Sequence, residues 1–195
     1  MHLRVGNTRY FLVSFIDAHS RYIVHGRLLP NMTAEEVALV QLEALEKYPA
    51  VKPQIVSDHG SQYTSREYRK LLERFELEHI LCRVAHPQSN GIIERYHRST
   101  RAALREELPP HYLAALDVIA AWVDDYNERR LHAGLRYIEP AEYFRGDPKR
   151  RMAERRAKLE RGRLYRRQIN LAREDQNVRS LNKSELPAVG AAAYG

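Results

Sequence analysis

A single apolar run places the strongest constraint on the fold. Within residues 9–17 (RYFLVSFID), every position from Tyr10 to Ile16 except Ser14 is apolar or aromatic, which predicts a strand buried on both faces and therefore central in a sheet. Gly6-Asn7 before this run predicts a tight turn from a first strand over 3–5, and a turn over 17–21 leads to a third strand over 22–29. The three strands together predict an antiparallel meander.

The hydrophobic period changes after the third strand. Thr33 and Glu36 form a capping-box pattern at the start of a helix over 33–48, and Thr64 with Glu67 suggests a second capping box. Apolar runs and helical periods then alternate, with strands expected over 54–57 and 77–85 and helices over 65–75, 91–107 and 111–130. This order predicts an α/β fold in which a mixed five-stranded sheet, the meander plus two crossover strands, is flanked by helices.

Charge is concentrated in one segment near the C-terminus. Residues 149–167 contain ten Lys or Arg against two Glu, a net of +8, whereas residues 1–148 contain 19 basic and 20 acidic residues, a net of −1. The composition shifts at Gly146-Asp147-Pro148, so we expect a core over 1–146 and a basic, helical and partly disordered tail over 147–195. Such a segment is either a solvated helix or a binding surface for a polyanion.

The bulk composition restricts the class of protein. The chain has 195 residues, of which 44% are hydrophobic and 29% charged, as in soluble globular proteins. The single cysteine, Cys82, excludes an intrachain disulfide framework and suits a reducing compartment. The longest apolar segment, 113–123, is too short to span a bilayer and contains Asp117. We therefore expect a cytoplasmic protein that does not bind membranes.

Two acids are placed where a sheet of this kind can bring them together. Asp58 directly follows the strand over 54–57, and Glu94 lies in the first turn of the helix expected from residue 91, with 35 residues between the two acids. Carboxylate pairs suit Mg²⁺ or Mn²⁺, and two such ions can assist phosphoryl transfer. Arg98 and Arg101 follow Glu94 at i+4 and i+7, on the same helix face. An ordinary exposed ion-pair face would show the same spacing.

Four segments in order make the sequence similar to a known family. IVSDHGSQYTS (55–65) and HPQSNGIIERYHRS (86–99) resemble the second and third acidic motifs of the DDE, retroviral-integrase-like transposases of bacterial insertion sequences. FIDAHSRYIV (15–24) resembles the strand-turn-strand signature of these integrase core domains, and YNERRLHAGLRYIEPAEYF (126–144) their downstream signature. The resemblance covers roughly residues 3–146 and implies an RNase H-like fold.

The resemblance also implies a chemistry. It makes Asp58 and Glu94 catalytic residues that hold Mg²⁺ or Mn²⁺, two ions in an intact family site, for DNA strand transfer during transposition. DNA, as transposon ends and target, is the expected substrate, and the chain is expected to form homo-oligomers or to associate with full-length transposase. The residues expected to contact DNA lie on the helix of Glu94 and in the basic segment: Arg95, His97, Arg98, Arg101, Lys149, Arg150 and Arg151.

The first acid of the family has no counterpart in this chain. In the family it lies on the first strand, in an Asp-x-Thr motif that would fall one or two residues upstream of Met1. Asp17 is a doubtful substitute, since it matches a separate position and is better explained as the cap of the turn into Ser20-Arg21. We therefore expect an N-terminally truncated transposase whose first strand is incomplete, with metal binding and activity impaired.

Two other functions share some of these features. A catalytically inactive transposase remnant or regulator would bind DNA through 149–167 and would need no third acid. A cellular nuclease of RNase H-like fold would share the sheet, but the signature over 126–144 argues against it. For Tyr126, Asn127, Arg130 and His132 within that signature, the sequence predicts only that they end the last long helix of the core and pack its turn.

Overall fold

A computed structural model describes residues 1–82, 87–104 and 109–184. The chain divides between Asp147 and Pro148 into two compact units, the first of which contains all the strands. Within the described residues, no helix combines the length and apolar character needed to cross a membrane.

The predicted meander is present and is antiparallel throughout. It consists of β1 (His2–Val5), β2 (Thr8–Ile16) and β3 (Ile23–Leu29), in the order β1-β2-β3. Gly6 has a φ of +56° in the β1–β2 turn, where an added Cβ would lie 3.0 Å from the Pro110 carbonyl oxygen. A side chain at this position would therefore be strained and crowded.

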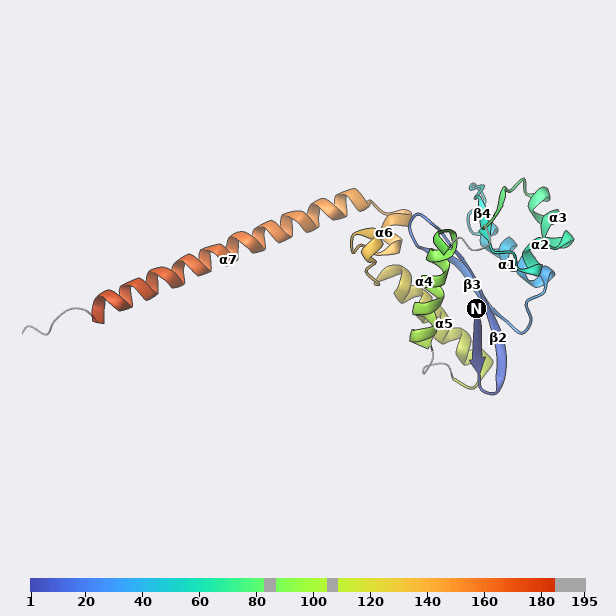
Figure 1. The fold of residues 1–195 in the computed structure, drawn as a ribbon, viewed down its shortest axis with the longest axis horizontal. Helices are drawn as coiled ribbons and strands as arrows, with labels where there is room; N and C mark the ends of the chain where they lie inside the picture. Colours follow the sequence, from blue (N-terminus) through green and yellow to red (C-terminus); the bar gives the residue numbers. More distant parts are fainter. Residues whose placement is uncertain (83–86, 105–108, 185–195) are drawn as a thin grey trace, which may run out of the picture. The chain divides into compact units, whose positions relative to one another are not determined.

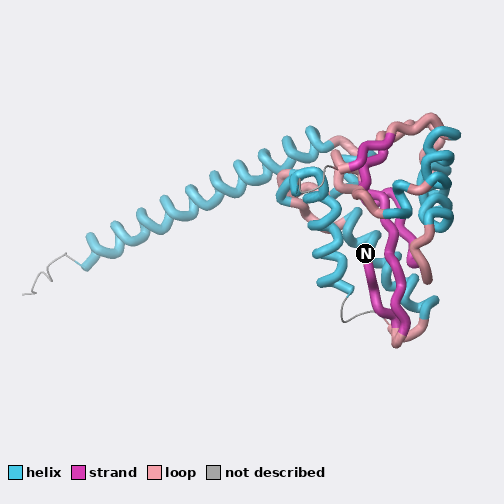
Figure 2. Tube along the Cα trace, turned by 45° about the vertical axis from the view of Figure 1, so that its right-hand side comes forward, coloured by secondary structure: helices cyan, strands magenta, loops and turns pink. Residues whose placement is uncertain are grey.

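The central strand is buried on both faces, as its composition predicts. Leu12 faces a cluster with β1, α5 (Tyr112–Glu128) and Leu104 of α4 (Pro87–Leu104), whereas Val13 faces α1 (Ala34–Glu46) and α3 (Arg66–Arg74). Figures 1 and 2 show α4 and α5 on one side of the meander and α1 to α3 on the other. The expected presence of helices on both faces of the sheet is thus confirmed.

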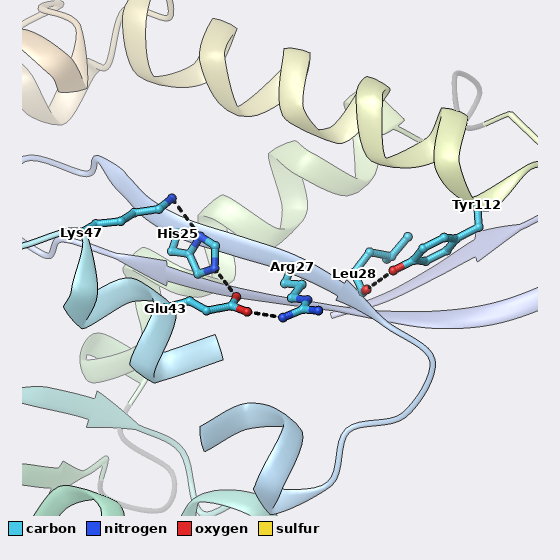
Figure 3. A network of polar contacts seen from close by, with 6 residues as sticks. All are labelled: His25, Arg27, Leu28, Glu43, Lys47 and Tyr112. Atoms are coloured by element: carbon cyan, nitrogen blue, oxygen red, sulfur yellow. Dashed lines mark hydrogen bonds and ion pairs between the residues drawn. The ribbon is translucent and has the colours of Figure 1, made fainter. Parts of the chain in front are cut away.

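Polar contacts attach a helix to each face of β3 (Figure 3). On one face, the Glu43 carboxylate of α1 accepts hydrogen bonds from Arg27 and from His25 Nε2, the latter at 2.8 Å. Lys47 Nζ lies 3.0 Å from His25 Nδ1. On the other face, the Tyr112 hydroxyl of α5 donates to the Leu28 carbonyl at 2.8 Å. Side chains of α1 and α5 therefore hold β3, the edge strand of the meander, in place.

The two crossover strands pair with each other in parallel. They are β4 (Ile55–Ser57) and β5 (His79–Leu81), and they form a two-stranded sheet separate from the meander. All five predicted strands and the mixed architecture are present. The predicted single five-stranded sheet is not formed among the described residues, because no strand of the meander is hydrogen-bonded to β4 or β5. Strands of three residues offer few backbone groups for such pairing. The predicted end of the fifth strand, 83–85, lies outside the described residues.

Helix starts are predicted correctly in one case and wrongly in two. The Thr33–Glu36 capping box is confirmed, with Glu36 N donating to Thr33 Oγ1 at 3.2 Å. The Thr64 capping box is wrong: Thr64 ends the short helix α2 (Ser61–Thr64), and Ser65 caps α3 by accepting from Tyr68 N. Helix α4 begins at Pro87 rather than near residue 91, consistent with the preference for proline in a first helical turn. The predicted helix end over 105–107 lies outside the described residues.

The core ends with a 3₁₀ turn (Ala133–Leu135) and α6 (Pro140–Arg145). The second unit contains α7 (Pro148–Ser184), a helix of 37 residues. At 1.5 Å per residue it is roughly 55 Å long. The described side chains of α7 are exposed or half-buried, so this helix has no apolar core of its own.

Candidate active site

Asp58 leaves the end of β4 on a short turn. Its Oδ1 accepts a hydrogen bond from Gly60 N at 3.0 Å, and the Ser57 hydroxyl donates to its carbonyl oxygen at 2.9 Å. The side chain of Asp58 is exposed, although Ile55 and Ser57 before it are buried. The strand thus delivers the carboxylate to the surface while the Gly60 amide limits its rotation, which is the arrangement the sequence predicts.

Buried contacts determine which face of α4 is exposed. Tyr96 and Thr100 are buried, the Tyr96 hydroxyl lies 2.9 Å from Ser14 Oγ of β2, and Trp122 Nε1 of α5 donates to Thr100 Oγ1 at 3.3 Å. With this face packed inward, Glu94, Arg98 and Arg101 are all exposed. Arg95 is also exposed, and His97 is half-buried.

Asp58 lies close to the face of α4 that carries Glu94. The pKa of His97 is lowered to about 4, mainly by burial and then by the Met1 ammonium and Arg101, while the nearby Asp58 carboxylate opposes these effects. His97 and Arg101 follow Glu94 at i+3 and i+7, so all three lie on one side of the helix. The same side that interacts with Asp58 therefore carries Glu94.

The start of the first strand lies beside these residues. The Met1 ammonium donates to the Leu12 carbonyl at 2.9 Å, which continues the β1–β2 ladder by one residue. Burial lowers the pKa of this ammonium, as does Arg101, whereas Asp58 raises it. Met1 therefore lies near Asp58 and Arg101, at the end of β1 where the family resemblance expects an acid shortly upstream.

Asp17 caps a turn. Its Oδ2 accepts from Ser20 N at 2.7 Å and from the Ser20 hydroxyl at 2.5 Å. Both bonds are local to the β2–β3 turn, which confirms the capping role predicted from the sequence. These two hydrogen bonds explain the position of the Asp17 carboxylate without a role in metal binding.

The donor set meets the needs of a divalent cation only in part. Asp58 and Glu94 supply carboxylate oxygens, the ligand type that Mg²⁺ and Mn²⁺ prefer. Across the described ranges, however, no three His, Cys, Asp or Glu side chains gather closely enough to hold a metal ion. The donors are therefore of the right kind, but they fall short of the three acids of the family site.

Lys149, Arg150 and Arg151 lie in the first turn of α7, in the second unit. Glu154 lies 3.8 Å from a side-chain nitrogen of each of the two arginines. All three basic side chains are exposed. They belong to the second unit, whereas α4 belongs to the first.

Sequence reasoning missed the role of Asn127. This buried side chain accepts a hydrogen bond from Ile23 N at 2.8 Å and donates one to the Ile23 carbonyl at 3.1 Å. It thereby pairs with the first residue of β3 as a neighbouring strand would. In the sequence, the only sign of this role is a polar residue within an apolar helical stripe. The hydrogen-bond partner of such a residue cannot be identified until the fold is known.

Two histidines with low pKa values predict loss of stability in acid. Burial, together with nearby cationic groups, lowers the pKa of His97 and of His132 from 6.5 to about 4. Between pH 6.5 and 4 the unfolded chain binds protons that the folded chain does not, so stability falls as the pH drops through this range. Because both rings are partly exposed, we expect a combined loss of about 1–2 kcal/mol.

Urea denaturation at several pH values between 7 and 4 measures this loss. A His97→Gln/His132→Gln variant should lose less stability than the original chain over the same range, because it lacks both titrating rings. An equally steep loss in the variant would assign the acid sensitivity to other groups.

Comparison with known proteins identifies the family. Models described as "Integrase core domain" match residues 1–87 and 76–140. An uncharacterized protein of insertion element IS136 from Agrobacterium fabrum is 32% identical over 142 residues, covering 69% of this chain and 73% of its own. The chain belongs to the integrase core domain family. Transposase InsD of IS2D from Escherichia coli is 31% identical over 137 residues, covering 67% of this chain and 46% of InsD.

Solved structures support the fold of this integrase core. The HTLV-2 integrase catalytic core domain, determined in complex with magnesium, aligns with a TM-score of 0.59 over 73% of this chain and 90% of its own, at 15% identity. The predicted family resemblance and RNase H-like fold are thereby confirmed. The catalytic and metal-binding roles of Asp58 and Glu94 are a proposal.

Proposed function

We propose that this integrase core carries out DNA strand transfer during transposition, with Asp58 and Glu94 as two of its catalytic acids. The observation that carries the proposal is the convergence of Asp58 with the α4 face of His97 and Arg101, beside the start of β1. The proximity of Asp58 to this face of α4 and to Met1 supports a site shared by the two acidic motifs and the first strand. Family membership supports DNA as the substrate.

In the first reaction, a water oxygen attacks a phosphorus at the transposon end. The P–O3′ bond breaks, and the end is released with a free 3′-hydroxyl. In the second reaction, this hydroxyl oxygen attacks a phosphorus of target DNA, and the P–O3′ bond of the target breaks. The first step consumes one phosphodiester bond, and the second exchanges one phosphodiester bond for another. In each step the attacking oxygen loses a proton and the departing O3′ gains one, so no oxidant or reductant is required.

We propose that Asp58 and Glu94 hold Mg²⁺ or Mn²⁺ together with the first acid of the family, which the resemblance places one or two residues upstream of Met1. When bound, such a cation would stabilise the charge that develops on the phosphate oxygens. The magnesium complex of the HTLV-2 core supports this choice of ion. A full family site would hold two ions, and the present pair of acids would bind them weakly.

The cationic residues of α4 act on the DNA backbone. Arg98 and Arg101 are exposed beside the acids, where their guanidinium groups can donate paired hydrogen bonds to phosphate. With a pKa of about 4, His97 is neutral at pH 7 and would donate a neutral hydrogen bond rather than a charge. Arg95 is exposed on the same helix and would contact a neighbouring phosphate.

A nicking and strand-transfer assay in Mn²⁺ tests the proposal. The substrate is a duplex with a transposon end, and the two proteins are the 195-residue chain and a version extended upstream to include an Asp-x-Thr. We expect transfer by the extended version and little or none by the shorter chain. Inactivity of both, with DNA binding intact, would favour a DNA-binding regulator over a transposase.

We also propose that the first part of α7 binds the DNA backbone without sequence preference. Its ten Lys and Arg over 149–167 are distributed around the helix, and those described are exposed. Each phosphate contact adds about 0.9 to the slope of log affinity against log salt on duplex DNA. If half of these residues contact phosphate, replacing all ten by glutamine lowers the slope by about 4.

Fluorescence anisotropy with a labelled duplex at several salt concentrations measures this slope. Glutamine retains helix propensity, so the substitution removes charge and keeps the helix. The matched control replaces three exposed core arginines, Arg9, Arg66 and Arg74, by glutamine. A salt slope that is the same with and without the ten charges would exclude α7 as a DNA contact.

We also propose that copies of this chain associate with one another, as in the trimeric and dimeric forms of the HTLV-2 core, and light scattering tests this proposal.

A further inference from the structure

The end of the core contains a tight turn with an unusual sequence. Ile138 N donates to the Leu135 carbonyl at 3.2 Å, and the two residues between them, Arg136 and Tyr137, have φ values of +56° and +59°. Positive φ at both central positions defines a type I′ turn, for which Asn-Gly is the preferred pair. Here an arginine and a tyrosine occupy these positions.

These two side chains make the turn less stable than it could be. Left-handed backbone is disfavoured for residues with a large side chain. Arg136 is exposed, and Tyr137 is 56% exposed. The turn is nevertheless fixed at its base, where Tyr137 N donates to the His132 carbonyl at 2.8 Å and His132 pairs with Ile138. Strain at an exposed, well-fixed position points to a function in binding.

The base of the turn is cationic. Arg130 lies over the rings of Trp122 and Tyr126, at 5.5 and 5.7 Å from their centroids. The His132 ring is 4.8 Å from that of Tyr126, and its Nε2 is buried with no hydrogen-bond partner in the described part of the chain. After burial, Arg130 and Arg21 are the groups that lower the pKa of His132, so both lie near it.

Arg21 gives a second sign of strain at the same place. Its φ is +64°, and it precedes by two residues Ile23, which is hydrogen-bonded to Asn127 at the end of α5. Among the described residues, four other than glycine have positive φ, and three of them are Arg21, Arg136 and Tyr137. Residues 129–137 (RRLHAGLRY) include three arginines and no acid, and Arg129 is ion-paired with Asp125 of α5. Strained backbone and positive charge thus coincide around His132.

We propose that the Leu135–Ile138 turn binds an unpaired nucleotide, with the Tyr137 ring stacked on the base and the Arg136 guanidinium on an adjacent phosphate. An exposed aromatic ring beside cationic groups is the usual means of binding single-stranded nucleic acid. That the natural ligand is DNA rests on the proposed function. The strand freed when DNA ends are processed supplies such unpaired nucleotides.

The double substitution Arg136→Asn/Tyr137→Gly separates binding from stability. It installs the preferred type I′ pair, so we expect a melting temperature about 2–6 °C higher, because strain is relieved. We expect affinity for a labelled oligothymidine of about 16 nucleotides to fall about 10-fold, because stacking on Tyr137 is lost. Anisotropy is measured at raised salt, where the phosphate contacts of α7 contribute less. A variant that is more stable and binds the oligonucleotide as tightly as the original chain would overturn the proposal.

Three single variants support the comparison. Tyr137→Phe keeps the ring and should bind like the original chain, whereas Tyr137→Ala should bind more weakly. Arg9→Asn removes one exposed charge from β2 and should have little effect. Cross-linking to an oligonucleotide with 5-iodouracil, followed by mass spectrometry, should identify the peptide that begins at Tyr137. Cross-links confined to α7 would reject the turn as a nucleotide site.

The two proposals fail in different ways. Weaker oligonucleotide binding by the Asn-Gly variant, without strand transfer by the extended chain, would support the nucleotide site and reject the transposase. Strand transfer with unchanged oligonucleotide binding would reject the nucleotide site alone.

Discussion

Replacing Asp58 with asparagine, in a version extended to include the upstream acid, is expected to reduce strand transfer by more than about 100-fold. This figure is the upper range for losing an outer-shell partner of a metal site, and a direct ligand should cost more. Asparagine keeps the size of the side chain and can still accept from Gly60 N through its oxygen. The loss would therefore follow from the missing charge. Glu94→Gln should have an effect of the same size, and gel assays of strand transfer measure both.

Asp17→Asn is the matched control for these variants. Its amide oxygen can still accept from Ser20 N, so the turn should keep its shape and activity should change only about two-fold. DNA binding by all three variants should remain, since Arg98 and Arg101 are unchanged. A loss with Asp17→Asn as large as that with Asp58→Asn would make Asp17 the third acid and contradict the assignment of a capping role alone.

Most of the fold could be predicted from local pattern. The apolar run over 9–17, the Gly6-Asn7 turn and the Thr33–Glu36 capping box each specify structure within a few residues, and all three are confirmed. The errors arise where two local solutions compete. Thr64 and Ser65 can both cap α3, and the sequence does not show that Thr64 is already part of α2.

The candidate site could be predicted only in part. Asp58 stands out in the sequence as an acid at a strand end, and this position is confirmed. Glu94 stands out as an acid in the first turn of a predicted helix, and this is wrong: α4 begins at Pro87, so Glu94 lies beyond its first turn. The approach of Met1 and His97 to Asp58 depends on how β1 and α4 pack, which periodicity does not specify. The type I′ turn was missed for another reason: its sequence, Arg136-Tyr137, is the opposite of what that turn prefers.

The largest expected effect on stability is at Asn127. Its amide makes two hydrogen bonds to the main chain of Ile23 and is 4% exposed, so it replaces a neighbouring strand at the start of β3. In Asn127→Leu, the N–H and C=O of Ile23 would be left buried without partners. Each such group costs about 1–3 kcal/mol, so we expect a loss of about 2–4 kcal/mol in the free energy of unfolding. Urea denaturation measures the loss, and the melting temperature should fall by about 6–12 °C.

Two further variants show whether the loss comes from these hydrogen bonds. Asn170→Leu makes the same change at an exposed position of α7 and should leave stability nearly unaltered. Asn127→Asp keeps an acceptor for Ile23 N but can donate to the Ile23 carbonyl only when it is protonated. Its deficit relative to the original chain, measured at the same pH, should therefore shrink as the pH is lowered from 7 to 4. A deficit independent of pH, or a loss below about 0.5 kcal/mol in Asn127→Leu, would mean that packing rather than this amide connects α5 to β3.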